Sequence, residues 1–139
     1  MKILYFDASN GVSGDMFVGA LVDLGADFEK IKKDVMSLGL DISLKAEKGD
    51  SHGISATRFT VTDNVTGTPP DQLSAPAADD HHHDHRHLSD IRQMIEGAQM
   101  DNAVKDSAIA IFELIARAEA DVHGVDIESV HFHEVGALD

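Results

Sequence analysis

A proline-rich segment in the middle of the chain separates two regions that can each form regular secondary structure. All three prolines lie between Asn64 and Asp80, among threonine, serine, alanine and glycine residues. Such a composition buries too little apolar surface to offset the entropy lost on ordering. We therefore expect residues 64–87 to be a mobile linker inside a single domain that spans residues 1–139.

Before the linker, the sequence predicts a strand, two helices and a hairpin. Lys2–Phe6 is short, apolar and aromatic, as in a buried strand. Helices are expected after a Ser13 N-cap and over Ala26–Leu38, because apolar residues recur there at helical spacing. Residues 42–48 and 54–63 alternate with period two, which predicts a β-hairpin.

After the linker, the sequence predicts a short helix over Leu88–Glu96 capped by Ser89, a longer helix after Asp101, and a strand over Val130–Val135. The long helix carries an apolar stripe that we expect to face the core, formed by Val104, Ala108, Ile111, Ile115, Ala118 and Val122. The element order predicts an α+β two-layer sandwich, with helices on one face of a mostly antiparallel sheet. A ferredoxin-like topology is one candidate.

Charge and cysteine content exclude several classes of function. The net charge is −14, with no cysteine. An acidic chain is a poor partner for nucleic acid or anionic lipid, and a chain without cysteine has no disulfide or thiolate site. Any metal must bind through histidine, carboxylate or other oxygen ligands. No targeting peptide or membrane-spanning stretch is recognisable, so we expect a cytoplasmic protein.

Five histidines lie within seven residues at the end of the predicted linker, namely His81, His82, His83, His85 and His87. Neutral imidazole is a donor that nickel, copper and zinc prefer over oxygen ligands. A tract in a mobile linker imposes no fixed geometry, so it suits metal delivery or storage better than catalysis. The alternative is a hydrophilic linker that binds metal only incidentally.

A second cluster lies near the C-terminus, at His131, His133 and Glu134. Alternate residues of a strand share a face, which would place the two histidines about 6.5–7 Å apart on one side. They can converge on one ion or one anionic group. The alternative is a pair of surface or core-edge histidines with structural partners.

A third candidate site is the turn that follows the first predicted strand. Its polar side chains and glycines are Asp7, Ser9, Gly11, Ser13, Gly14 and Asp15. A turn leading into a helix presents backbone N–H groups at a place where α/β proteins often bind ligands. The turn has neither a P-loop lysine nor a third glycine, so a metal-bridged phosphate or a polar group held by the serines fits better. The alternative, to which we give equal weight, is that the segment is only a tight turn with a good N-cap and binds no ligand.

Three segments together resemble the LarC family of nickel insertion proteins. They are Tyr5–Met16, the histidine tract with the following Leu88–Ile91, and the closing Val130–Asp139. In that family the full protein installs nickel into a pyridinium bisthiocarboxylate mononucleotide, with consumption of CTP. The product is the nickel-pincer cofactor of lactate racemase. The resemblance therefore implies a lyase-class nickel cyclometallase.

The resemblance also assigns roles to the candidate residues. It implies nickel binding by His81, His82, His83, His85, His87, His131 and His133. It makes Asp7, Ser13, Asp15 and Glu134 candidates for catalysis, and Ser9, Gly11 and Gly14 candidates for cofactor binding. The expected partners are the pincer nucleotide precursor and either a missing C-terminal domain or a split second subunit; homo-oligomerisation is left open.

The family's C-terminal domain, expected to bind CTP with Mg²⁺ or Mn²⁺, is absent from these residues. The chain stops at Asp139 inside a family motif, which predicts a fragment, a truncated frame or a split product. Alone, it is expected to bind nickel without completing the reaction. Two alternatives are a non-catalytic nickel-binding or metallochaperone module, and a metal-dependent hydrolase that uses Asp7, Asp15, His131 and His133.

Overall fold

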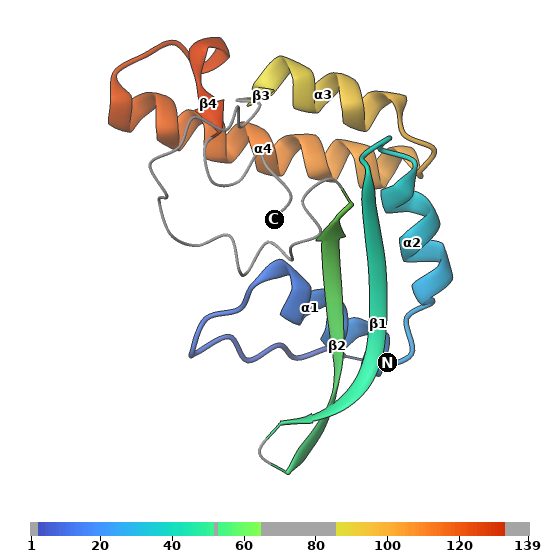
Figure 1. The fold of residues 1–139 in the computed structure, drawn as a ribbon. Coiled ribbons are helices and arrows are strands. Elements are labelled where there is room, and N and C mark those ends of the chain that lie inside the picture. The colour runs from blue at the N-terminus through green and yellow to red at the C-terminus, as the bar shows by residue number, and fades with distance from the viewer. Residues whose placement is uncertain (1–2, 52, 65–85, 133–139) are drawn as a thin grey trace.

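The computed structural model describes residues 3–51, 53–64 and 86–132. Along the chain these residues form two helices and a hairpin, then a short strand, two further helices, a 3₁₀ turn and a second short strand. Figure 1 shows the hairpin and the first two helices below the second pair of helices. The class is mixed α+β, as predicted.

The first half of the fold is built on the predicted hairpin. Strands β1 (Ile42–Ser51) and β2 (Ile54–Asp63) pair antiparallel from Ile42 opposite Asp63 to Ser51 opposite Ile54. Helices α1 (Gly14–Asp23) and α2 (Phe28–Met36) contact this hairpin. The buried core consists of Ile42, Leu44 and Phe59, with Val18, Phe28, Val35, Leu40 and Val61 packed against it.

Gly19 lets α1 approach the hairpin closely. A Cβ atom added at Gly19 would lie 2.5 Å from the backbone oxygen of Thr57 on β2. Real Cβ atoms do not come that close to another heavy atom, so only glycine fits at this helix–strand contact without a shift of the backbone.

The predicted N-terminal strand is wrong for the residues that the structure describes. Ile3, Leu4 and Tyr5 are 78%, 59% and 83% exposed, and no described strand pairs with them. Phe6 alone finds an aromatic contact, with its ring centroid 4.8 Å from that of Phe17 on α1. Apolar composition favours an extended backbone, but a strand also needs a neighbouring edge to satisfy its N–H and C=O groups.

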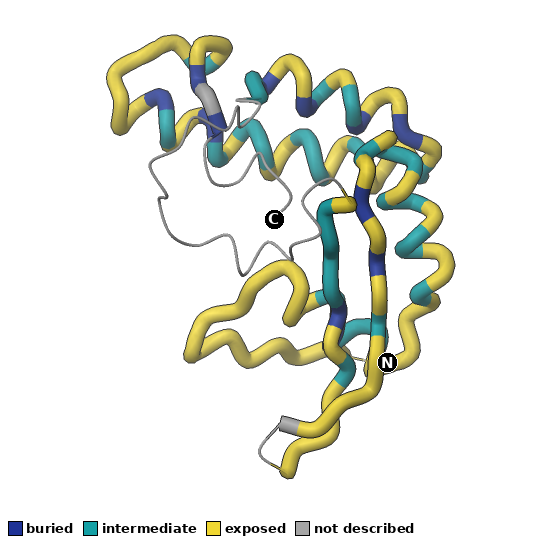
Figure 2. The backbone as a smooth tube through the Cα atoms, viewed as in Figure 1, coloured by how far each residue is buried: buried dark blue, intermediate teal, exposed yellow. Residues whose placement is uncertain are grey.

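The second half of the fold is a pair of helices closed by two short strands. Strand β3 (Arg86–His87) leads directly into α3 (Leu88–Gly97), and α4 (Asn102–His123) follows. The 3₁₀ helix η2 (Ile127–Ser129) then precedes β4 (His131–Phe132). The buried core consists of Leu88, Ile91, Ile95, Ala116, Ala120, Val130 and Phe132. Figure 2 shows these buried positions interleaved with exposed ones along both helices.

One arginine ties this half together. Arg92 on α3 binds Glu113 on α4 at 2.8 Å and Glu128 on η2 at 3.0 Å. These two carboxylates raise the pKa of the guanidinium, first through the hydrogen bond to Glu113. The network fixes η2, and therefore the start of β4, to the helix pair.

The two halves meet at the end of α2. The Ser37 hydroxyl accepts a hydrogen bond from the Gln99 backbone N–H at 2.9 Å, and Leu38 packs against the second core. Lys30 lies 3.9 Å from Asp101, the residue before α4.

Several predicted boundaries and faces differ from those observed. The described strands form two separate two-stranded sheets, so the single sheet and ferredoxin-like topology are not seen in this part of the chain. The predicted linker over 64–87 ends earlier than expected, since Arg86 and His87 form β3; residues 65–85 lie outside the described regions. His87, and not Ser89, is the N-cap of α3.

The helix boundaries and the α4 stripe also need correction. The second helix is shorter than Ala26–Leu38, because Asp27 caps it by accepting from the N–H groups of Glu29 and Lys30. The predicted core stripe of α4 is only partly right, since Val104, Ile111, Ala118 and Val122 are exposed. None of the helices in residues 3–51, 53–64 and 86–132 has the length and apolar character needed to cross a membrane.

Candidate functional site

The turn before α1 is held by its own side chains. The Asp7 carboxylate accepts a hydrogen bond from the Ser9 N–H at 3.0 Å, and the Gly11 N–H donates to Ala8 at 2.9 Å. Gly11 has φ +83°, a conformation that glycine adopts without a steric penalty. The Ser9 N–H and hydroxyl together lower the pKa of Asp7, so this exposed carboxylate is charged at neutral pH.

The helix start brings a second carboxylate beside the turn. Ser13 is the N-cap of α1, as predicted, although its hydroxyl hydrogen-bonds the Asp15 carboxylate and not the backbone. The same carboxylate accepts from the Met16 N–H at 2.8 Å. Gly14 is the first residue of the helix. The turn is therefore exposed and acidic, with several of its donors already used by Asp7 and Asp15.

A pairing that the sequence did not predict joins the other two candidate clusters. Strands β3 and β4 run antiparallel, with Arg86 opposite Phe132 and His87 opposite His131. Side chains directly opposite each other in such a pair have Cβ atoms about 4.5–5.5 Å apart. The last histidine of the tract and the first histidine of the closing motif thus occupy facing positions.

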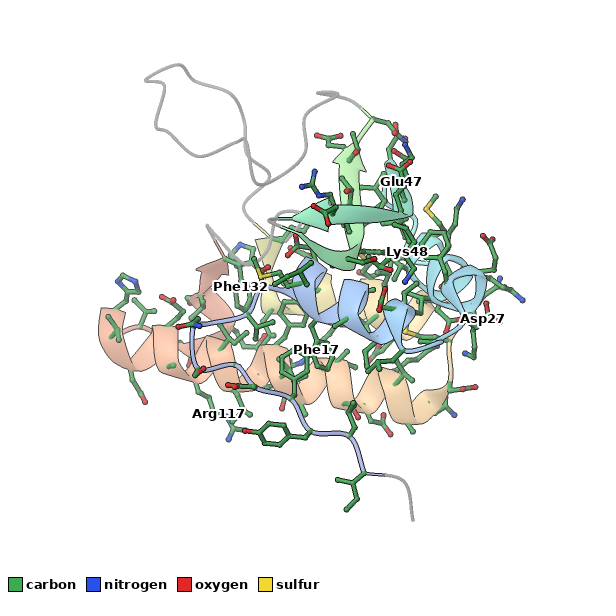
Figure 3. All side chains as sticks on the ribbon, turned by 90° about the horizontal axis from the view of Figure 1, so that it is seen from below. Phe17, Asp27, Glu47, Lys48, Arg117 and Phe132 are labelled. Atoms are coloured by element: carbon green, nitrogen blue, oxygen red, sulfur yellow. The ribbon has the colours of Figure 1, made fainter. Side chains whose placement is uncertain are left out.

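The core holds this pairing in place. Phe132 is 4% exposed, and its ring meets that of Phe112 on α4 edge to face, with centroids 5.9 Å apart (Figure 3). Leu88, the residue after His87, is fully buried in the same core. The Asp90 carboxylate accepts from the His87 N–H at 3.0 Å. Each histidine is therefore next to a residue anchored in the core, and His87 is itself half-buried.

The structure does not bring the acidic turn to the histidine pair. Figure 1 shows α1 and the turn before it beside the hairpin, below β3 and β4 and apart from them. Among the described side chains, no three histidine or carboxylate groups come together to hold a metal ion. The alternative of a hydrolase that combines Asp7 and Asp15 with His131 and His133 stays a prediction, because His133 lies outside the described residues.

His81, His82, His83, His85, His133 and Glu134 lie outside the described residues. The pairing of His87 with His131 was missed because a two-residue strand has no periodicity to detect. The only sequence-level indication was that each histidine directly precedes a large apolar residue, Leu88 or Phe132.

Comparison with known proteins decides the family. The profile described as "Nickel insertion protein" matches residues 4–139. The chain belongs to the nickel insertion protein family.

Relatives in this nickel insertion family match the whole chain. A pyridinium-3,5-bisthiocarboxylic acid mononucleotide nickel insertion protein from Geobacillus kaustophilus is 46% identical over 142 residues, covering 100% of this chain and 33% of the relative. Proteins of the same name from Akkermansia muciniphila and a Thermotoga species are each 42% identical, with 33% and 34% of their lengths covered. The chain thus spans about a third of the length of these curated relatives. No solved structure matches it.

Proposed function

We propose that this chain gathers Ni²⁺ and presents it for insertion into pyridinium-3,5-bisthiocarboxylic acid mononucleotide. The observation that carries the proposal is the register of β3 and β4, which sets His87 opposite His131. Support also comes from the relatives, which are named as nickel insertion proteins for this mononucleotide. Nickel is the cargo of this reaction, so its site must both capture the ion and release it.

The paired positions suit a transfer site. The register places two histidine positions opposite each other, and a site with two imidazole ligands would leave most coordination positions of a borderline metal ion free for incoming and departing ligands. His87 is also the last residue of the histidine tract. An ion held by His81, His82, His83 or His85 would therefore need to move only a few residues along the chain. The net charge of −14 favours the approach of divalent cations.

The acidic turn is our second proposed element, for the nucleotide. Asp7 and Asp15 repel a bare phosphate, but a divalent ion between them and a phosphate reverses that preference. Ser9, Gly11, Ser13 and Gly14 would then line the bound group. Because the turn and the histidine pair lie apart, we propose that the complete protein brings substrate and nickel together. Catalysis by Asp7, Ser13, Asp15 and Glu134, CTP consumption with Mg²⁺ or Mn²⁺, and a lyase-class reaction are proposed for that complete protein.

Calorimetric titration with NiCl₂ tests the nickel site. One variant replaces His81, His82, His83 and His85 by alanine and keeps both paired positions. It should retain one binding event, and adding His87→Ala or His131→Ala should each abolish it, because a two-imidazole site needs both ligands.

A matched control is available at the end of α4. The His123 side chain is 65% exposed and pairs with Glu119 at 3.2 Å, so His123→Ala should leave nickel binding unchanged. If the four-alanine variant binds no nickel, or if His87→Ala behaves like His123→Ala, the paired site is wrong.

A second assay separates insertion from simple metal carriage. The nickel-loaded chain is incubated with the mononucleotide and CTP, with and without the remaining part of a full-length relative, and the nickel adduct is measured by mass spectrometry. Adduct formation only when the remainder is present supports a role in insertion. No adduct in either case, with nickel still bound, favours a metallochaperone.

A further inference from the structure

Helix α4 has two apolar faces, and the described structure covers only one. The face toward α3 contributes Ala108, Ile109, Phe112, Ile115, Ala116 and Ala120 to the core. A second set lies on a neighbouring face and is exposed, namely Val104, Ile111, Leu114, Ala118 and Val122. Val104, Ile111, Leu114 and Val122 are 47%, 57%, 66% and 80% exposed. We call this set the outer stripe.

The outer stripe is a row of positions along one side of α4, with the exposed Ser107 in the gap between Val104 and Ile111. Its members follow one another at steps of seven, three, four and four residues. At about 100° per residue they fall within an arc of roughly 80° on the helix. Charged residues lie beside the stripe, including Arg117, which points outward from α4 in Figure 3. A row of large apolar groups bordered by charge is typical of a surface that binds another protein segment.

We propose that the outer stripe is the docking surface for the part of the full-length protein that this chain does not contain. The chain covers 33% of the Geobacillus and Akkermansia relatives, so about two thirds of their length is available to cover α4. A helix that is apolar over most of its circumference is stable when buried on both sides. The proposal rests on family membership and not on nickel binding, so the two proposals can fail separately.

Charge argues against a second copy as the occupant. Each chain carries −14, and pairing two outer stripes would bring the acidic residues along α4, such as Asp106 and Asp121, into one interface. Like charges of this kind oppose self-association. The same acidity predicts that the docking segment presents an apolar centre with lysine or arginine around it.

The isolated chain provides the first test. Sedimentation velocity should show a monomer, and Leu114→Asp should leave both the mass and the melting temperature unchanged, because the side chain is open to solvent. Binding of an apolar dye should fall in this variant. A dimer that Leu114→Asp dissociates would assign the stripe to a second copy. A large drop in the melting temperature of Leu114→Asp would mean that other residues of this chain already cover the outer stripe.

The second test uses a chimera in which this chain replaces the matching third of the Geobacillus kaustophilus relative. Ala118→Asp and Ala110→Asp form a matched pair, because both alanines are exposed on α4 and only Ala118 belongs to the outer stripe. Burial of the new carboxylate should lower the melting temperature of the chimera by about 5 °C or more for Ala118→Asp. Ala110→Asp should change it little, and hydrogen exchange should show α4 more protected in the chimera than in the isolated chain.

Two results overturn the proposal. One is a chimera in which Ala118→Asp and Ala110→Asp have the same effect and α4 exchanges as fast as in the isolated chain. The other is a chimera that aggregates, since a matching interface should keep the stripe covered.

Discussion

The close approach of α1 to the hairpin makes Gly19→Ala a sharp test of the fold that positions the acidic turn. The new Cβ would lie 2.5 Å from the Thr57 backbone oxygen, about 0.9 Å inside ordinary contact at 3.4 Å. Because that oxygen belongs to a paired strand, it cannot move aside as a flexible side chain does. The helix must shift instead, and overpacking of this kind costs about 2–3 kcal/mol.

Part of this cost is offset by helix propensity. Alanine is favoured over glycine within a helix by about 1 kcal/mol, which leaves a net loss of about 1–2 kcal/mol in the free energy of unfolding. For a chain of this size that corresponds to a melting temperature lower by roughly 3–8 °C. Urea unfolding followed by circular dichroism measures the first quantity, and calorimetry the second.

Gly14→Ala is the matched control, because Gly14 begins the same helix and an added Cβ there meets nothing within 4 Å. Its stability should stay within about 0.5 kcal/mol of the original chain. If Gly19→Ala were as stable as Gly14→Ala, α1 could not lie against β2 as described, and the position of the turn would have to be revised.

Three further substitutions test other parts of the structure. Arg92→Gln should lower the free energy of unfolding by about 0.5–1.5 kcal/mol, because it removes the ion pairs with Glu113 and Glu128. The loss should be smaller in 1 M NaCl, since salt screens the charges. A loss that salt does not change would mean that packing and not charge is responsible. The pKa of Asp23 is lowered by its hydrogen bonds to Lys48 and Thr57. Its contribution to stability is therefore present above the unfolded pKa and is lost as the pH falls through the folded pKa. Asp23→Asn should destabilise the chain at pH 7, and the destabilisation should shrink as the solution is acidified; a destabilisation that does not change with pH would refute this linkage. Phe132→Ala should cost about 3–5 kcal/mol in urea unfolding, because the ring is buried against Phe112, and a cost below 1 kcal/mol would show that β4 is not anchored there.

The hairpin and the helices were predictable because their information is local. Period-two alternation over 42–48 and 54–63 identified β1 and β2, and Ser13 and Asp101 correctly marked the starts of α1 and α4. The buried face of α4 was harder to predict. Its apolar residues satisfy helical spacing on more than one face, so periodicity alone could not choose the face that meets α3.

The candidate site also combines features that the sequence predicts with features that depend on contacts between distant segments. The chemistry of the site could be predicted from the sequence, because the chain has histidine donors without cysteine, a large negative charge, and the motifs of its family. The geometry of the site depends on the tertiary structure, which sets His87 opposite His131 across 43 intervening residues and keeps the turn before α1 apart from β3 and β4. The physical reason is that strand pairing and core packing depend on contacts between distant segments, which no local pattern of residues encodes.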